Sequence, residues 1–179
     1  MRRLLFALLF ALLPAFASAH GEHDHASLGT HEHGAAELNA ALDGTSLEIE
    51  LHSPAINLLG FEHAPRGDAD ERKVAETRSR LQQADLLFGL PADAQCRLDE
   101  VRLESPLFAK EHERQDTDGH SDIHAHYRFS CNSPNALSGL DLQGIFETFP
   151  GTEKVQAQLI GPNGQQGRLL RSEHAQITF

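Results

Sequence analysis

The chain has 179 residues, of which 26 are acidic and 15 basic, so its formal net charge is −11 with histidine counted as neutral. A polyanion without a lysine and arginine cluster is poorly suited to nucleic acid or to an anionic membrane surface, and it attracts cations. The 12 histidines are clustered, and imidazole is the commonest protein ligand for zinc, copper and nickel. The composition therefore favours metal binding.

The first 19 residues have the pattern of a secretory signal peptide. Arg2 and Arg3 precede an apolar run, and small residues at Ala17 and Ala19 form an A-x-A cleavage site. No later segment is apolar over the thickness of a bilayer. We therefore expect a signal peptide over residues 1–19, removed to leave a soluble periplasmic protein that begins at His20.

Residues 20–34 are rich in histidine, acid and glycine and offer little to bury, which predicts a His-rich mobile arm. Flexible tracts of this kind bind metal weakly and exchange it readily, which suits capture and delivery. We therefore interpret the first three histidines of the arm as collectors of metal, together with one in a later loop. These flexible collectors are His20, His23, His25 and His112.

Next, apolar and polar residues alternate on both sides of Asp43 and Gly44, which predicts a β-hairpin. With those two residues as the turn, Leu38 lies opposite Ile49 and Ala36 opposite Leu51. The same register puts His33 diagonally across from His52 on the polar face.

A helix is predicted over about residues 69–88, with Asp68 as its N-cap and Glu71 completing a capping box. Its apolar positions recur at helical spacing and should pack on the sheet. They are Val74, Leu81, Ala84 and Phe88.

A second strand pair follows, at residues 98–103 and 123–131, with a change of phase after Leu98 that suggests a bulge. Because side chains alternate along a strand, His124 and His126 share the face opposite the core. Between the strands lies a long acidic loop, at about residues 107–122, that carries His112 and His120. Loops of this length are usually functional or disordered.

The last third is expected to add further antiparallel strands, with Phe146 and Phe149 as core anchors. The predicted fold is a single α+β domain over residues 35–179. It is mainly an antiparallel β-sheet of hairpins, with one amphipathic helix packed on it.

Only two cysteines occur, Cys96 and Cys131, and in an oxidising compartment they are expected to form one structural disulfide. A pair of thiolate metal ligands is the weaker alternative, because no C-x-x-C spacing is present and oxidation would remove the ligands.

Three H-x-H pairs occur, and the third lies on a strand that turns both rings the same way, which predicts a folded metal site centred on His124 and His126. Zinc needs further ligands in a tetrahedral arrangement, and the acids Glu32, Glu62 and Asp122 could bind it or orient imidazole groups. The candidate ligands are His124, His126, His31, His33, His63, His52, His120 and Glu62.

Four stretches of the chain carry a family resemblance: HEHGAAELNAALDG, LEIELHSPAINLLGFEHAP, the His-rich acidic loop and HAHYRFSC. Together they resemble the Zrg-type (ZrgA-like) periplasmic zinc-uptake proteins of Gram-negative bacteria. The resemblance implies a Zn²⁺-binding protein that works with an inner-membrane ABC-type transporter and an energised outer-membrane receptor. By motif it covers three pairs of residues: His31 with His33, Glu62 with His63, and His124 with His126.

Two alternatives remain open. One is a copper or nickel chaperone or buffer, although the single methionine argues against Cu(I) handling. The other is a histidine-brace copper enzyme that uses His20 as its first residue, which Gly21 and the polar arm disfavour. Because no hydrolytic or nucleotide-binding motif is present, we expect no enzymatic activity. A homodimer is left open.

Overall fold

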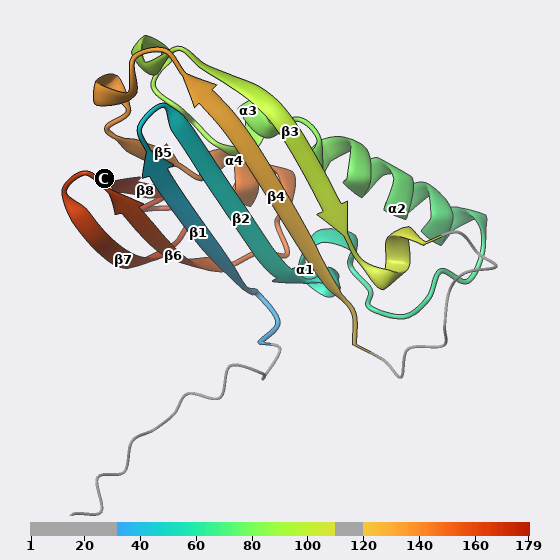
Figure 1. Ribbon diagram of the computed structural model, residues 1–179. Coiled ribbons are helices and arrows are strands. Elements are labelled where there is room, and N and C mark those ends of the chain that lie inside the picture. The colour runs from blue at the N-terminus through green and yellow to red at the C-terminus, as the bar shows by residue number, and fades with distance from the viewer. Residues whose placement is uncertain (1–31, 110–119) are drawn as a thin grey trace, which may run out of the picture. The chain divides into compact units, whose positions relative to one another are not determined.

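The computed structural model describes residues 32–109 and 120–179 (Figure 1). The predicted signal peptide, nearly all of the arm and the middle of the acidic loop lie outside this part of the chain. Five of the candidate ligands therefore also lie outside the described residues. They are His20, His23, His25, His31 and His112.

The main sheet has six strands in the order β3-β4-β2-β1-β6-β7. The strands are β1 (Ala35–Asp43), β2 (Ser46–Pro54), β3 (Cys96–Glu104), β4 (Asp122–Cys131), β6 (Lys154–Gly161) and β7 (Gly164–Leu170). A second, two-stranded sheet pairs β5 (Gly139–Asp141) with β8 (Gln176–Thr178). The mainly antiparallel α+β prediction is confirmed.

One neighbouring pair departs from the antiparallel expectation, because β6 runs parallel to β1. The carbonyl of Gly34, just before β1, accepts hydrogen bonds from the backbone of Glu153 at 2.7 Å and Lys154 at 2.9 Å. These bonds place the starts of β1 and β6 at the same end of the sheet. The contact joins residues more than a hundred positions apart, so no local sequence pattern predicts it.

The hairpin of β1 and β2 forms, but in a register two residues away from the prediction. Leu38 pairs with Leu51, and the turn residues are Gly44 and Thr45. Gly44 has a φ of 59°, while Thr45 is not among the residues with positive φ, a combination typical of a type II′ turn. Because the turn sits one residue later than expected, every cross-strand partner changes.

The predicted helix over residues 69–88 is divided into α2 (Asp68–Leu81) and α3 (Ala84–Leu87). At the end of α2, the carbonyl of Leu81 accepts a hydrogen bond from the buried Tyr127 hydroxyl at 2.9 Å. The predicted capping box is wrong in position, since Gly67 is the N-cap and Asp68 is already helical. The predicted apolar stripe is nevertheless buried throughout.

The remaining helices are α1 (Ala55–Leu59) and α4 (Gln143–Thr148). Short 3-10 turns occur at Ala92–Ala94, Pro106–Phe108 and Pro134–Ala136. In Figure 1 the helices and the small sheet cover one face of the main sheet and leave the other face open. Phe146 and Phe149 are buried on the covered side, as predicted. None of the helices in the described part of the chain is long and apolar enough to cross a membrane.

Strand β4 shows how the sheet separates its two faces. Its odd positions, from Ile123 to Cys131, are buried, whereas His124 and Arg128 are exposed and His126 is half-buried. Strand β3 pairs with it antiparallel, with the predicted irregularity between Leu98 and Glu100. The histidines of β4 therefore face away from the core, on the open side of the sheet.

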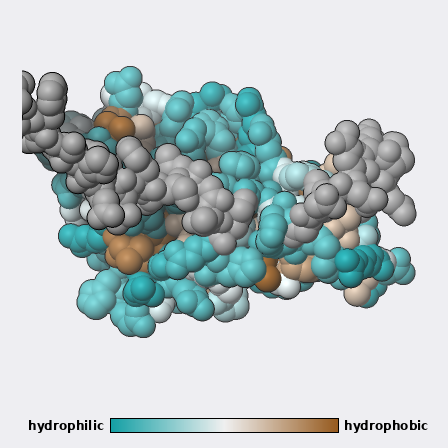
Figure 2. Space-filling view, turned by 90° about the horizontal axis from the view of Figure 1, so that it is seen from below, coloured by the Kyte–Doolittle hydropathy of each residue, from teal (hydrophilic) through white to brown (hydrophobic). Residues whose placement is uncertain are grey.

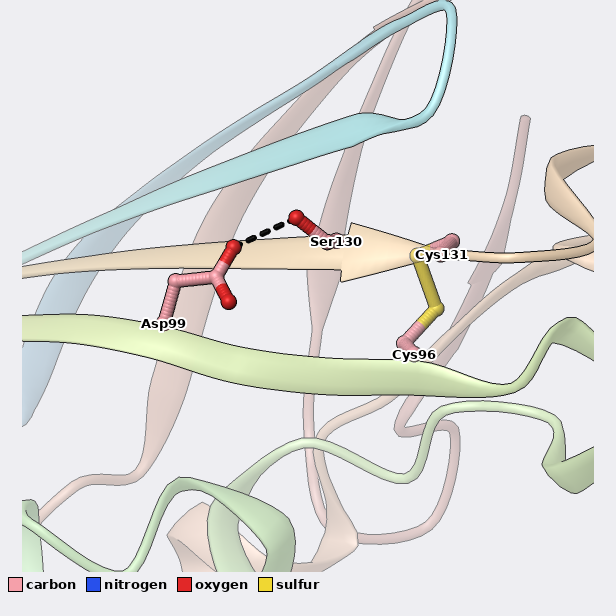
Figure 3. The surroundings of a disulfide bond; sticks show 4 residues. All are labelled: Cys96, Asp99, Ser130 and Cys131. Atoms are coloured by element: carbon pink, nitrogen blue, oxygen red, sulfur yellow. Dashed lines mark hydrogen bonds between the residues drawn. A yellow bond between two sulfur atoms is a disulfide. The ribbon is translucent and has the colours of Figure 1, made fainter.

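The predicted disulfide between Cys96 and Cys131 is present and joins paired residues at one end of the β3–β4 ladder (Figure 3). Beside it, the Ser130 hydroxyl donates a hydrogen bond to Asp99 across the same two strands. The described residues contain no free cysteine, so thiolates are not available as metal ligands there.

Candidate metal centre

Several of the described histidines gather at the end of the sheet opposite the disulfide, where β1 and β4 begin and β2 ends. Pro54, the last residue of β2, pairs with Asp122, the first residue of β4. Figure 2 looks onto this end from below, and its coloured surface is mostly hydrophilic, with hydrophobic patches that are small and separate. Two groups of potential metal ligands form here among the described residues.

The first group, which we call the Glu62 group, consists of His33, Glu62 and His120. Nδ1 of His120 lies 2.9 Å from Oε2 of Glu62, and Nε2 of His33 lies 3.5 Å from Oε1 of the same carboxylate. The three ligand atoms lie within 4.8 Å of one another. Donors bound to one tetrahedral zinc ion are separated by about 3.3 Å, so little movement is needed to close the site.

Three different segments bring these side chains together. Glu62 follows α1, which ends at Gly60 in the left-handed conformation with a φ of 86°. His120 directly precedes Ser121, whose carbonyl accepts a hydrogen bond from the backbone of Ala55 at 2.8 Å. The chain just after β2 is thereby tied to the start of β4.

His33 is positioned through its neighbour Gly34. The side-chain Oδ1 of Asn57 accepts a hydrogen bond from the Gly34 N–H at 2.7 Å, and its Nδ2 donates to the carbonyl of Ala35 at 2.8 Å. An ion pair between Glu32 and Lys154 at 2.6 Å holds the preceding residue. His33 is therefore fixed by its backbone, although its ring is exposed.

The carboxylate of Glu62 is the unusual member of the group. Its side chain is only 7% exposed, and Oε1 is buried without a hydrogen-bond partner. An ionised carboxylate buried in this way is unfavourable unless it is paired, protonated or bound to a cation. The two imidazoles beside it are 54% and 63% exposed, so the group combines a buried anion with accessible nitrogen ligands.

The second group, which we call the His52 group, consists of His52, Asp122 and His124. Nε2 of His52 lies 3.2 Å from Oδ2 of Asp122. The rings of His52 and His124 are stacked, with centroids 4.3 Å apart and planes inclined by 8°. Two of its members, His52 and His124, line an open pocket of about 510 Å³ on the outer face of the sheet.

The remaining predicted ligands lie in other surroundings. His126 has its Nε2 3.8 Å from Oε2 of Glu48. His63 is stacked on Phe61, with ring centroids 4.9 Å apart, and its Nδ1 lies 2.9 Å from the carbonyl of Ala64. Neither residue belongs to the two groups. His33 and His52, which the predicted register placed together, belong to different groups, because His52 pairs with Glu37 and β1 begins only at Ala35.

The sequence interpretation did not identify Asn57 as a residue that shapes the site. An asparagine inside the apolar stretch AINLL, directly after a strand, was the available signal. A polar residue buried to 4% exposure requires hydrogen-bond partners. Its partners turn out to be the backbone that carries His33.

Comparison with known proteins gives one finding. A family model described as "ZrgA family zinc uptake protein" matches residues 30–179, which include all six residues of the two groups. No curated protein matches the chain.

Proposed function

The chain belongs to the ZrgA family of zinc uptake proteins, and on this premise we propose that it binds Zn²⁺ in the periplasm at the Glu62 group and passes the ion to an inner-membrane ABC-type importer. Zinc is the cargo in this proposal, and the protein carries out no chemical reaction on it. The family favours zinc over the copper and nickel alternatives.

The observation that carries the proposal is the buried Glu62 carboxylate between two imidazoles. Its Oε1 lacks a hydrogen bond, and Nε2 of His33 lies 3.5 Å from it. A divalent cation would neutralise the carboxylate and satisfy this oxygen. Two imidazole nitrogens and one carboxylate oxygen also form a common ligand set for zinc that leaves one position open.

The same geometry favours a site that both loads and releases its ion. His33 and His120 expose more than half of their side-chain surface, so solvent or a partner's ligand can reach the metal. Only Glu62 is buried. A transport protein needs such an open position, whereas a structural zinc site is closed by four protein ligands.

The location and the partner are supported by other features of the chain. The predicted signal peptide and the disulfide both fit an oxidising compartment outside the cytoplasm. The high negative charge attracts cations to the surface. The ABC-type importer comes from the family resemblance and is part of the proposal.

Calorimetric titration of the purified full chain with ZnCl₂ tests the binding site, after metal removal and in a buffer with a competing chelator. Glu62→Gln keeps the shape of the side chain but removes its charge. We expect it to weaken zinc binding by at least about tenfold, the lower limit for losing even an indirect contact to a metal. Glu147→Gln is the control, because it makes the same change from a carboxylate to a carboxamide at an exposed position on α4.

Folding is checked separately, because a loss of binding could reflect a damaged structure. Urea unfolding of the metal-free Glu62→Gln protein should show equal or greater stability, since a buried charge has been removed. Unchanged zinc affinity in this folded variant would overturn the proposed site. Growth under zinc chelation, with and without the importer genes, tests the proposed transport partner.

A further inference from the structure

The His52 group lies outside the site proposed above, and its geometry points to a second zinc site on the open face of the sheet. We propose that His52, Asp122 and His124 bind one zinc ion, independently of the ion at the Glu62 group. The identity of the ion as zinc rests on the proposed function. The two sites share no ligand.

The sheet register builds this second site. His52 on β2 and His124 on β4 are direct cross-strand partners, and both side chains lie on the open face. Asp122 precedes His124 by two residues on β4, so its side chain points to the same face. Cross-strand partners on one face have Cβ atoms about 5 Å apart, a spacing at which two imidazoles can reach one metal.

Like Glu62 in the first site, His52 has a buried polar atom without a hydrogen bond. Its Nε2 is buried at the atomic level and has no hydrogen-bond partner, although Oδ2 of Asp122 is 3.2 Å away. On the other side of the ring, Nδ1 faces a Glu37 carboxylate oxygen at 4.0 Å. A carboxylate on the Nδ1 side favours the tautomer that leaves Nε2 free to bind a metal.

The stacked rings indicate what must change when the ion binds. An imidazole binds metal through a lone pair in the plane of its ring, and the two planes are nearly parallel at 8°. Parallel rings 4.3 Å apart direct their lone pairs side by side and cannot share one ion. His124, the exposed member, must therefore rotate, while the half-buried His52 stays in place beside Asp122.

The charges around the pocket leave the site available to a cation. Arg128 pairs with Glu100 at 2.6 Å, and Arg102 lies 3.6 Å from the other oxygen of the same carboxylate. These arginines are thus directed toward Glu100. Glu50 and Glu104 also line the pocket, and their charges favour the approach of a divalent ion.

Zinc stoichiometry of the full chain tests the proposal. The metal-free protein is loaded with ZnCl₂ and dialysed against a weak chelator that removes zinc from the His-rich stretches, and the retained zinc is counted. We expect the wild type to retain one ion more than His124→Ala and one ion more than Glu62→Gln. The double variant should lose both, and His174→Ala, an exposed histidine elsewhere, should lose none.

A second measurement covers the case in which the chelator strips the weaker site. In NMR spectra of the histidine rings, zinc should shift the signals of His52 and His124 in the Glu62→Gln variant, where the first site is disabled. Unstacking of the rings should accompany the shift. His52→Ala must abolish the shift of His124.

The outcomes separate the two proposals. If Glu62→Gln loses an ion while His124→Ala retains the full complement and zinc leaves both rings unchanged, the second site is overturned and the first stands. If His124→Ala loses an ion while Glu62→Gln does not, the first site fails and the second is supported.

Discussion

Asn57 holds the backbone of Gly34 and its neighbour through both ends of its side-chain amide. Its Oδ1 accepts a hydrogen bond from the Gly34 N–H, and its Nδ2 donates to the Ala35 carbonyl and to the Ser53 hydroxyl. Asn57 and Gly34 are both buried. One side chain on α1 therefore fixes the residue that follows His33, and so links the short helix to a proposed zinc ligand.

Asn57→Ala should lower both stability and zinc affinity. It leaves the Gly34 N–H and the Ala35 carbonyl without these partners, which should cost about 2–4 kcal/mol of unfolding free energy. Because His33 loses its fixed backbone, zinc should bind the Glu62 group several-fold more weakly. Urea denaturation and zinc calorimetry measure the two effects.

Asn132→Ala, at an exposed position, is the matched control and should change neither quantity. Asn57→Asp keeps an acceptor for Gly34 but places a buried carboxylate oxygen against the Ala35 carbonyl, so it should destabilise the fold at least as much as Asn57→Ala. If Asn57→Ala destabilised the fold but left zinc affinity at the wild-type value, Asn57 would have no part in positioning His33.

Local patterns in the sequence were sufficient for the elements and their buried faces. Alternation predicted β1, β2 and β4, and helical spacing predicted the buried stripe of α2. The end of α2 was not predicted; there the carbonyl of Leu81 accepts a hydrogen bond from the hydroxyl of Tyr127, 46 residues away. Tertiary hydrogen bonds of this kind leave no local pattern.

The candidate ligands were predictable as a set, but their grouping was not. Each group joins segments from different parts of the chain, so a shift of one turn residue at Gly44 changes which side chains meet. The sequence paired His124 with His126 because they are neighbours on one strand. The structure stacks His124 on His52, which is another of the predicted ligands.

Tyr127 makes stability depend on pH in the alkaline range. Its side chain is fully buried, and burial raises the pKa of its hydroxyl above the ordinary value. The unfolded chain releases this proton above about pH 10, whereas the folded chain retains it. The unfolded state is then favoured, so stability falls as the pH rises through and beyond this range.

Tyr127→Phe isolates this contribution. At neutral pH its unfolding free energy should be lower by about 1 kcal/mol, because the hydrogen bond to the Leu81 carbonyl is lost. Above about pH 10 its stability should decline less steeply than that of the wild type. Urea denaturation of both proteins from neutral to alkaline pH measures the difference, and parallel curves would contradict the assignment.

The disulfide should stabilise the fold without contributing to zinc binding. Cys96 and Cys131 are 35 residues apart, and closing such a loop is worth about 4 kcal/mol in the chain-entropy model. The bond lies at one end of the β3–β4 ladder, and the Glu104–His124 pair lies at the other end. At the rise of an extended strand the two ends are about 25 Å apart.

The variant with both cysteines changed to alanine should therefore unfold at a lower urea concentration. At a temperature where it remains folded, its zinc stoichiometry should equal that of the wild type. Oxidised and reduced wild-type protein provide a comparison without substitution. Loss of a retained zinc ion from the folded double variant would show that the disulfide does hold the ligands in place.

His126 belongs to the ligand set suggested by the sequence but not to the one suggested by the structure. An H-x-H pair on a strand suggests that His124 and His126 chelate one ion together. In the structure, Nε2 of His126 lies 3.8 Å from Glu48 instead, and the residue is not part of the His52 group. His126→Ala should therefore weaken zinc binding at the second site by less than about threefold, whereas His124→Ala should weaken it by at least about tenfold.

Both variants are best measured on the Glu62→Gln background, where the first site does not contribute to the titration. Glu48→Gln, which changes only the residue facing His126, serves as the control and should have no effect. Equal losses for His124→Ala and His126→Ala would mean that both rings of the H-x-H pair turn toward one ion. His126 would then join His52, Asp122 and His124 as a fourth ligand, because zinc takes four ligands in a tetrahedral arrangement.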